Sequence, residues 1–169
     1  MITYVKGDVL KAFDESTNCI LMHQENCISI KKSGFAKILY DKFPEAHIQK
    51  RLPGYFGDVI FTQVSKDKFV YNLYSQYYPS GPKGEMCTFE GFRAIDDYET
   101  RIKALEKCLY KVESHISETN RKILLPLIGS GLAKDKSKSH FSDLDYFMSY
   151  IGPTVDKILG NFDINVYYL

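Results

Sequence analysis

The sequence predicts an α/β fold, a three-layer α/β/α sandwich around a mixed central sheet of about six strands. Short runs of β-branched and apolar residues alternate along the chain with segments whose apolar residues recur at every third or fourth position. The run Lys122–Pro126 is apolar in the way expected of a strand that is covered on both faces. With 169 residues, of which 44% are hydrophobic, the chain is long enough for one domain with a full core, and we expect a single domain over residues 1–169.

Six segments have the composition of strands, and turn-forming residues bound several of them. The polar turn Ser65-Lys66-Asp67 lies between two of these segments and predicts a hairpin. The expected strands are residues 2–6, 19–23, 58–64, 68–75, 122–126 and 163–169.

Three segments have helical spacing of their apolar residues. The first is Gly34–Phe43, with Ser33 placed as its N-cap. The second, residues 95–116, keeps the spacing of three and four without interruption. The third runs from Phe141 to about Leu159, and Pro153 either kinks it or starts a second piece.

Composition excludes several classes of protein. Lysine and arginine total 22 against 21 acidic residues, and this net charge of +1 argues against a nucleic-acid partner. No apolar run is long enough to span a membrane, and the start of the chain lacks the pattern of a signal peptide. The four cysteines are scattered without metal-ligand spacing, so we expect no metal and reduced thiols in the cytoplasm.

A glycine-containing loop after the strand at 122–126 is the first candidate binding element. Gly129 and Gly131 flank Ser130, and two glycines one residue apart let backbone N–H groups turn toward one point. That geometry suits a phosphate. A tight turn with no ligand explains the same residues equally well at this stage.

The residues after the first strand offer a second candidate. The Asp8 carboxylate would accept a hydrogen bond from an exocyclic amine such as adenine N6, while the backbone N–H of Val9 donates to the ring. The alternative is that Asp8 only caps a helix.

The residues from His23 onward form a third candidate loop. Asn26 offers a donor and an acceptor to a pair of sugar hydroxyls, and His23 would be a general base near neutral pH. A structural, hydrogen-bonded histidine is the alternative. The helix N-terminus at Gly34-Phe35-Ala36 is a place where a phosphate would dock.

In their order along the chain, these elements resemble a macro domain, the ADP-ribose-binding fold, over nearly the whole sequence. The resemblance is greatest to the branch that contains terminal ADP-ribose protein glycohydrolase and small proteins like the ADP-ribose 1''-phosphate phosphatase. The matching motifs are Ile2–Val9, His23-x-x-Asn26-Cys27, Ser33–Ala36, Phe43-Pro44, Gly57-Asp58-Val59, Asn72-Leu73-x-x-Gln76, Asp97-Tyr98-Glu99, Pro126–Ala133 and Val166–Leu169.

The resemblance implies a role for each matched position. Asp8, with Val9, would hold adenine, and Asn26 would face the distal ribose. His23 matches a histidine that is implicated in catalysis in the phosphatase-like members, with Asn26 orienting the ribose. The first phosphate loop would be Ser33, Gly34 and Phe35, and the second would be Gly129, Ser130, Gly131 and Leu132.

The departures from the family pattern bear on activity. Gln76 and Ala133 stand where the glycohydrolase has its lysine nucleophile and its aspartate, so a covalent lysine mechanism is not expected. Whether Asp135 replaces that aspartate is open. Ser29 and Lys32 replace two glycines of the first loop, which adds side chains where backbone would approach a ribose.

Three functions remain open on the sequence. One is a hydrolase that acts on ADP-ribose 1''-phosphate or an ADP-ribosyl ester by positioned water attack. Another is a non-catalytic module that reads or sequesters ADP-ribose, free or protein-linked, or a related NAD-derived nucleotide. Both would be monomers without a cofactor. The third is an interaction or RNA-binding domain with a basic rim made of Lys31, Lys32, Lys134, Lys136 and Lys138.

Overall fold

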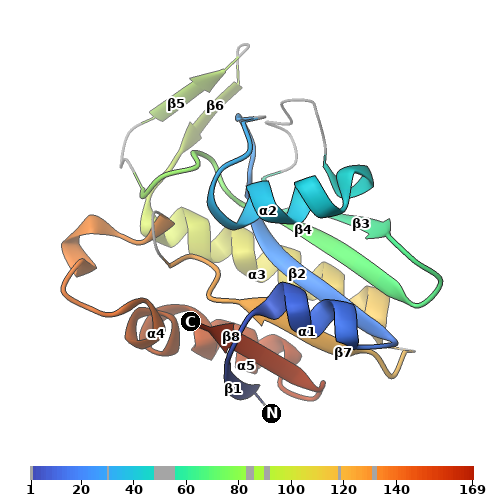
Figure 1. The fold of residues 1–169 in the computed structure, drawn as a ribbon. Coiled ribbons are helices and arrows are strands. Elements are labelled where there is room, and N and C mark those ends of the chain that lie inside the picture. Colours follow the sequence, from blue (N-terminus) through green and yellow to red (C-terminus); the bar gives the residue numbers. More distant parts are fainter. Residues whose placement is uncertain are drawn as a thin grey trace.

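A computed structural model describes residues 2–29, 31–47, 56–82, 86–89, 92–117, 119–130 and 133–169, with backbone alone for 86–89 and 92–94. The main sheet has six strands in the order β1-β8-β7-β2-β4-β3 (Figure 1). All neighbours are parallel except β3 and β4, so the sheet is mixed. Its strands are β1 (Ile2–Lys6), β2 (Cys19–Asn26), β3 (Val59–Gln63), β4 (Lys68–Gln76), β7 (Lys122–Pro126) and β8 (Ile164–Tyr168).

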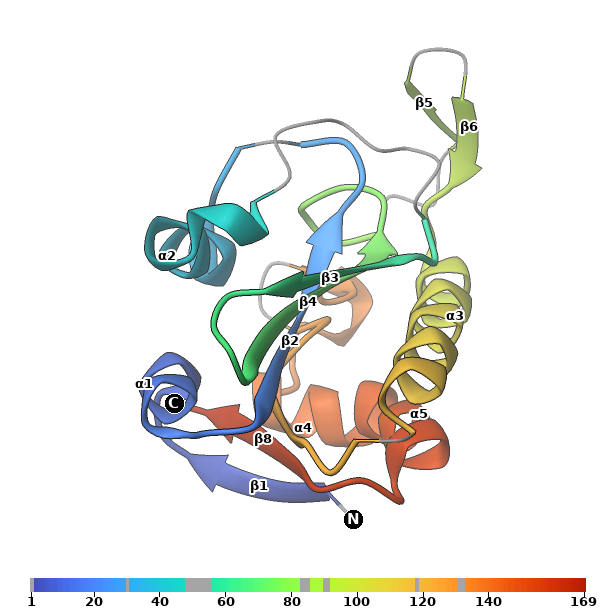
Figure 2. The ribbon, with the colours of Figure 1, turned by 90° about the vertical axis from the view of Figure 1, so that its right-hand side faces the viewer.

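Helices cover both faces of this sheet and make three layers. Helices α1 and α2 lie on one face, and α3 and α5 lie on the other (Figure 2). The predicted α/β/α sandwich with a mixed sheet of about six strands is therefore confirmed. The helical segments are α1 (Val9–Glu15), α2 (Gly34–Lys42), η1 (Pro44–Ala46), α3 (Tyr98–Ile116), η4 (Lys136–Lys138), α4 (Asp143–Tyr146), η5 (Phe147–Ile151) and α5 (Gly152–Leu159).

Alternate residues of the central strands supply the two cores. In β2, Ile20 and Met22 pack in the core with α3 and α5, while Cys19 and Leu21 pack in the core with α1 and α2. Side chains of successive strand residues point to opposite faces, so a strand covered on both sides is apolar at every position. This is why the central strands can be recognised from sequence. None of the described helices is long and apolar enough to cross a membrane.

The six expected strands all occur, and the pair predicted to form a hairpin is β3–β4. One boundary matters for function. The expected strand at 19–23 continues to Asn26 as β2, so His23 and Asn26 belong to the strand and not to a loop after it. The pairing of β2 with β4 shifts register between Glu25 and Asn26, where the strand leaves the regular ladder.

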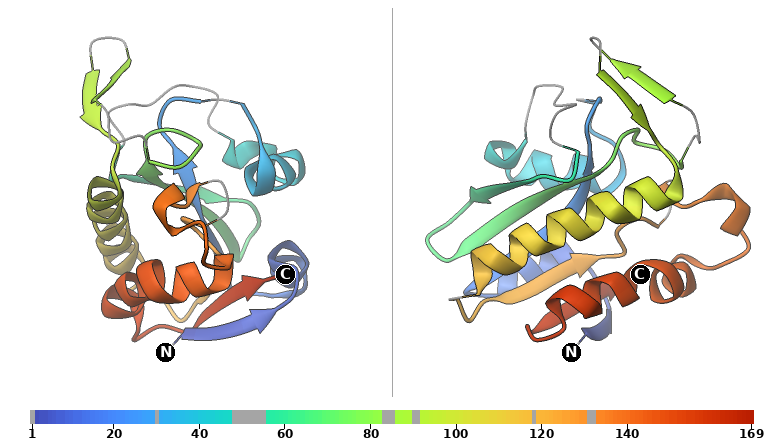
Figure 3. Two further views of the ribbon diagram at one scale, coloured as in Figure 1. Left: turned by 90° about the vertical axis from the view of Figure 1, so that its left-hand side faces the viewer. Right: turned by 180° about the vertical axis from the view of Figure 1, so that it is seen from behind.

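The long helix begins later than its apolar spacing suggests. Ile95 is the last residue of β6 (Phe92–Ile95), which pairs only with β5 (Met86–Phe89) in a separate two-stranded sheet that projects from the body (Figure 3). The helix starts at Tyr98 because the Asp97 side chain caps it, accepting from the Thr100 N–H at 2.7 Å. The expectation of a helix from residue 95 is wrong at this end.

The last helical segment is divided into three pieces. A π-helical turn, η5, separates α4 from α5, and Pro153 lies in the first turn of α5. Proline is tolerated in a first turn because its nitrogen would have no intrahelical partner there. Of the two alternatives, Pro153 starts a second piece.

Candidate functional site

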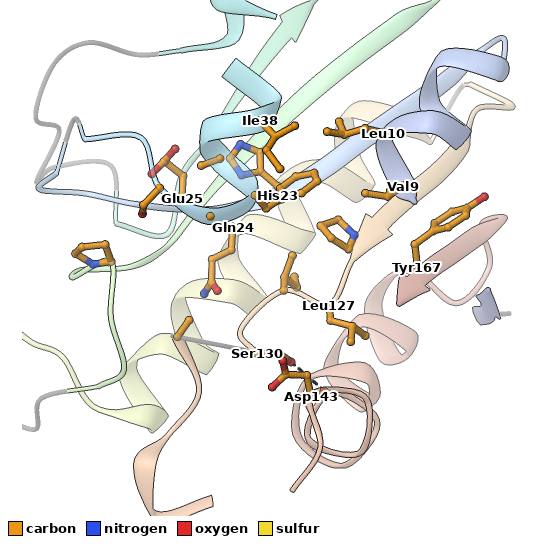
Figure 4. Close-up of a pocket in the computed structure, with 18 of the residues that line it drawn as sticks. Val9, Leu10, His23, Gln24, Glu25, Ile38, Leu127, Ser130, Asp143 and Tyr167 are labelled. Carbon is orange, nitrogen blue, oxygen red and sulfur yellow. Dashed lines mark hydrogen bonds between the residues drawn. The ribbon is translucent and has the colours of Figure 1, made fainter. Parts of the chain in front are cut away.

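A cavity of about 790 Å³ lies at the carboxyl ends of the parallel strands (Figure 4). Ligands of α/β sheets bind at this edge, and the volume is within the range of small-molecule sites, about 300–1,000 Å³. The residues that line it come from the β1–α1 junction, the end of β2, the start of α2, the end of β4, the loop after β7 and the C-terminus.

Most of the residues predicted from sequence are brought together here. Those that line the cavity are Asp8, Val9, His23, Asn26, Ser33, Gly34, Phe35 and Ser130. Gly129 does not line it and faces a small neighbouring void instead. Gly131 and Leu132 lie outside the described residues.

Asp8 caps α1, a helix that the sequence analysis did not assign. Its Oδ1 accepts from the N–H groups of Leu10 at 2.8 Å and Lys11 at 3.3 Å. Among the described residues, its Oδ2 accepts no hydrogen bond. The cap and the ligand role are therefore compatible, because they use different oxygens of one carboxylate.

Asn26 is nearly buried and its side chain is held by local hydrogen bonds. Its Oδ1 accepts from the N–H groups of Ile28 at 3.2 Å and Ser29 at 2.6 Å. Its Nδ2 donates to Glu25 Oε1 at 2.9 Å. Asn26 thus shapes the loop after β2 as well as facing the cavity.

His23 is buried and makes hydrogen bonds to other side chains. Its Nε2 lies 2.9 Å from Asn72 Oδ1 and 3.0 Å from Tyr40 Oη. Asn72 Nδ2 donates to the carbonyl of Ala46 at 2.8 Å, which directs Oδ1 toward the ring. Since that oxygen only accepts, Nε2 carries the hydrogen, and Nδ1 is the basic nitrogen.

Burial lowers the pKa of His23, although Glu25 opposes the shift. The ring is therefore neutral at pH 7, which is the protonation state of a general base, but its basicity is reduced. The hydrogen-bonded structural histidine, the alternative stated above, describes its surroundings well. Its catalytic role stays a prediction.

The start of α2 opens directly into the cavity. Ser33 occupies the N-cap position, as predicted, although its side chain makes no capping hydrogen bond. Gly34 has a φ of +53°, a conformation that favours glycine, and no described atom lies within 4 Å of where a Cβ would be. The first turn of α2 is thus left for a ligand to approach.

The loop after β7 is fixed by a side chain from β2. Gly129 has a φ of +71° and donates its N–H to Gln24 Oε1 at 2.8 Å. Gln24 Nε2 donates in turn to Ser75 Oγ at 2.9 Å, so one amide links β2, β4 and the loop after β7. Ser130 lines the cavity, and its hydroxyl donates to the Asp143 carbonyl at 3.2 Å (Figure 4). The Gly129 amide is therefore engaged within the protein.

A buried ion pair holds the chain behind this loop. The Arg101 guanidinium contacts Asp96 through two hydrogen bonds, of 2.6 and 2.7 Å, and both side chains are at least 94% buried. The same guanidinium donates to the carbonyls of Ala133 at 3.4 Å and Tyr78 at 3.3 Å. It joins the segment after β4 to the end of the second loop.

Of the positions that depart from the family pattern, some line the cavity and others do not. Gln76 and Ala133 line it. Asp135 does not line it and caps η4 by accepting from the Ser137 N–H at 2.9 Å. Of the five lysines expected at the rim, Lys31 and Lys32 line the cavity. Lys134 pairs with Asp143 at 3.0 Å and is not among the lining residues.

Neither thiol nor metal chemistry is indicated at this site. Cys19, Cys27 and Cys108 form no disulfide and are buried. Burial raises the pKa of Cys27, which follows Asn26, to about 12, so it is protonated at neutral pH. Within the described part of the chain, no three acidic, histidine or cysteine side chains come together as a metal site would need.

Sequence reasoning missed several residues of the site. Glu25 lines the cavity beside Asn26, and its Oε2 accepts a hydrogen bond from Tyr40. Tyr167 and the two residues after it line the end near Val9. The apolar run that defined the second strand ends before Glu25, and no motif in the sequence marks that residue.

Solved structures with this fold are similar over their whole length. A protein of unknown function from Bacteroides thetaiotaomicron aligns with a TM-score of 0.70 and 22% identity, covering 100% of this chain and 98% of that one. The macrodomain of Mycobacterium tuberculosis DarG aligns at 0.65 and 20%, covering 100% and 98%. A macrodomain protein from Streptomyces coelicolor aligns at 0.63 and 19%, covering 100% and 99%. No protein-family model and no curated protein sequence matches. The chain therefore has the macrodomain fold that its motifs predict.

Proposed function

We propose that this chain binds ADP-ribose or a derivative of it, free or attached to protein, in the cavity at the carboxyl ends of the strands. The observation that carries the proposal is that one cavity joins Asp8 and Val9, the open N-terminus of α2 and Ser130 of the loop after β7. These would supply an adenine-binding pair, a helix N-terminus that suits an anion, and a residue of the opposite loop, which together match the parts of a nucleoside diphosphate sugar.

Each part of the ligand has a partner in this arrangement. The Oδ2 of Asp8, which does not cap the helix, accepts from the adenine amine, and the Val9 N–H donates to the ring. The diphosphate lies against the first turn of α2, where the helix dipole and unpaired N–H groups favour an anion. Ser130 approaches it from the opposite loop. The distal ribose then lies toward Asn26.

Two substitutions of Asp8 test adenine recognition without removing the helix cap. Asp8→Asn keeps an oxygen for the cap but puts an NH2 group in place of Oδ2, and Asp8→Ser keeps a capping hydroxyl alone. By calorimetry we expect micromolar affinity for ADP-ribose in the wild type. Both variants should bind at least about tenfold more weakly, a loss of about 1.4 kcal/mol. Unchanged affinity in both, with unfolding unchanged, would contradict this site.

Hydrolysis is a second candidate because a carboxylate, Glu25, lines the cavity beside Asn26. Asn26 would orient the ribose, and Glu25 or His23 would take a proton from water as the water oxygen bonds to the anomeric carbon. The bond from that carbon to the carboxylate or phosphate oxygen breaks, and the leaving group departs as an anion with the electron pair of that bond. Release of ADP-ribose from an ADP-ribosyl ester, and of phosphate from ADP-ribose 1''-phosphate, measures this activity. Loss of turnover in Glu25→Gln but not in His23→Gln would assign the base to Glu25. If the chain binds ADP-ribose but releases neither product, it is the non-catalytic module that reads or sequesters the ligand.

A further inference from the structure

We propose that the end of the cavity at Glu25 selects a distal sugar that presents hydrogen-bond donors and rejects one that carries a further phosphate. The ligand class is then ADP-ribose with hydroxyl or N–H groups at its distal ribose, and not the 1''-phosphate. This inference rests on the proposed function and specifies it.

Among the residues that the structure describes, the Glu25 carboxylate accepts hydrogen bonds from neutral donors only. Its Oε1 accepts from the Asn26 N–H at 2.8 Å and from Asn26 Nδ2 at 2.9 Å, and its Oε2 accepts from Tyr40 Oη. In the described ranges no lysine, arginine or histidine forms an ion pair with it. Glu25 lies across the cavity from Val9 and Tyr167 (Figure 4). Because Val9 belongs to the proposed adenine-binding pair, Glu25 is at the opposite end of the cavity from adenine.

The neighbouring histidine does not offset this charge. His23 belongs to the same network through Tyr40, whose Oη lies 3.0 Å from Nε2. Burial lowers the pKa of His23, so the ring is neutral and adds no positive charge that would attract a phosphate. The network is therefore anionic as a whole.

Gln76 supplies a second acceptor at this end. It is paired with Asn26 in the ladder between β2 and β4, it lines the cavity, and it is 7% exposed. Its Oε1 is buried and accepts no hydrogen bond from the residues that the structure describes. A buried acceptor without a donor is costly, and a ligand hydroxyl or N–H that reaches it would satisfy it. A phosphate oxygen would not.

The two lysines that line the cavity are close in sequence to the start of α2. Lys31 and Lys32 directly precede the first turn of α2, where the diphosphate is proposed to lie. Lys32 Nζ is also 3.3 Å from Asp41 and is partly neutralised there. The charge of Lys32 is therefore held on the α2 side of the cavity, where the diphosphate is proposed to lie.

The test compares two ligands that differ by one phosphate. We expect calorimetry on the wild-type chain to give at least about tenfold tighter binding of ADP-ribose than of ADP-ribose 1''-phosphate. The ratio should fall as salt is raised, because screening weakens the repulsion by Glu25. Equal or tighter binding of the phosphorylated ligand would overturn the inference and leave the proposed function standing. Failure of both ligands to bind would overturn the proposed function itself.

Variants then test which residues cause the difference in affinity between the two ligands. Glu25→Gln should reduce the ratio to about threefold or less, chiefly by strengthening the phosphorylated ligand. Glu99→Gln, the same change on an exposed side chain of α3, should leave the ratio as it is. Gln76→Met, which removes the acceptor at similar volume, should weaken ADP-ribose without helping the phosphorylated ligand. An unchanged ratio in Glu25→Gln would contradict the role given to this carboxylate.

Discussion

At the scale of single residues, the polar groups at the end of β2 are held by one another before any ligand arrives. His23, Asn26 and Glu25 each have hydrogen-bond partners that fix their orientation. Such preorganisation lowers the entropy that a ligand must overcome on binding. It also links the protonation of His23 to folding.

The lowered pKa of His23 makes folding depend on pH in a definite direction. The ring is neutral in the native state but takes up a proton below pH 6.5 when the chain is unfolded. The unfolded state then binds more protons, so stability falls as the pH is lowered from 6.5 toward the native pKa. This site contributes at most about 1.4 kcal/mol per pH unit. In urea unfolding between pH 7.5 and 5, His23→Gln should show a shallower loss than the wild type. Equal slopes would show that His23 does not titrate differently in the two states.

The ion pair of Arg101 with Asp96 gives a second prediction. Arg101→Met leaves a fully buried carboxylate without its cation and releases two backbone carbonyls, so we expect unfolding to become easier by about 3–5 kcal/mol. Lys103→Met on the same helix removes an exposed pair with Glu99 and should change stability by no more than about 0.5 kcal/mol. Urea denaturation of both variants separates the buried pair from a general loss of charge on α3.

At the scale of elements, the two loops that flank the cavity each depend on one glycine, but in different surroundings. Gly34 and Gly129 both have positive φ. A Cβ at Gly34 meets no described atom within 4 Å, whereas at Gly129 it would lie 3.0 Å from Ile151 Cδ1 in the core. The two sites therefore separate the cost of conformation from that of crowding.

Alanine should lower the free energy of unfolding by different amounts at these two positions. Gly34→Ala should cost about 1 kcal/mol, for the left-handed conformation alone. Gly129→Ala should cost about 2–3 kcal/mol, because Ile151 must also move. Thermal or urea unfolding of the two variants measures the difference. Similar losses at both positions would mean that the packing of Ile151 adapts freely.

The elements of the sheet could be predicted from sequence because their apolar residues are local signals. Helix α1 has only seven residues, too few for periodicity to distinguish it from a loop. Ile95 has helical spacing from Tyr98 by coincidence, and the capping residue Asp97 was the better indication of the helix start. The end of β2 is polar, so composition gave no sign that the strand continues to Asn26.

The residues that line the cavity could be predicted where a sequence motif contains them, and not where a tertiary contact positions them. Asp8 and Gly34 lie in motifs, and both line the cavity. The Gly129 amide was expected to face a phosphate, but Gln24, 105 positions earlier, accepts its hydrogen bond. Glu25 of β2 is held in the cavity by a hydrogen bond from Tyr40 of α2, which is 15 positions later in the sequence. Such contacts depend on tertiary structure, which no local pattern records.

At the scale of the whole molecule, ligand binding should stabilise every layer together, because the cavity is lined by strands and helices from both ends of the chain. Ligand at 100 times its dissociation constant adds about 2.7 kcal/mol to the free energy of unfolding. For a chain of this length the midpoint should rise by roughly 5–10 °C. A thermal-shift series with ADP-ribose, AMP and NAD measures this rise. No shift with any of them at saturating concentration would contradict binding in the cavity.

The position of the C-terminus has a practical consequence. Leu169 is 97% exposed yet lines the cavity, as Tyr167 does, so a tag fused after it begins at the side of the cavity where we propose that adenine lies. Ile2 begins β1, which pairs in parallel with β8, so Ile2 lies at the amino ends of the strands, away from the cavity. An affinity tag or fluorescent fusion at the C-terminus should therefore interfere with binding measurements, and an N-terminal one should not. Immobilisation through the N-terminus leaves the cavity facing the solution.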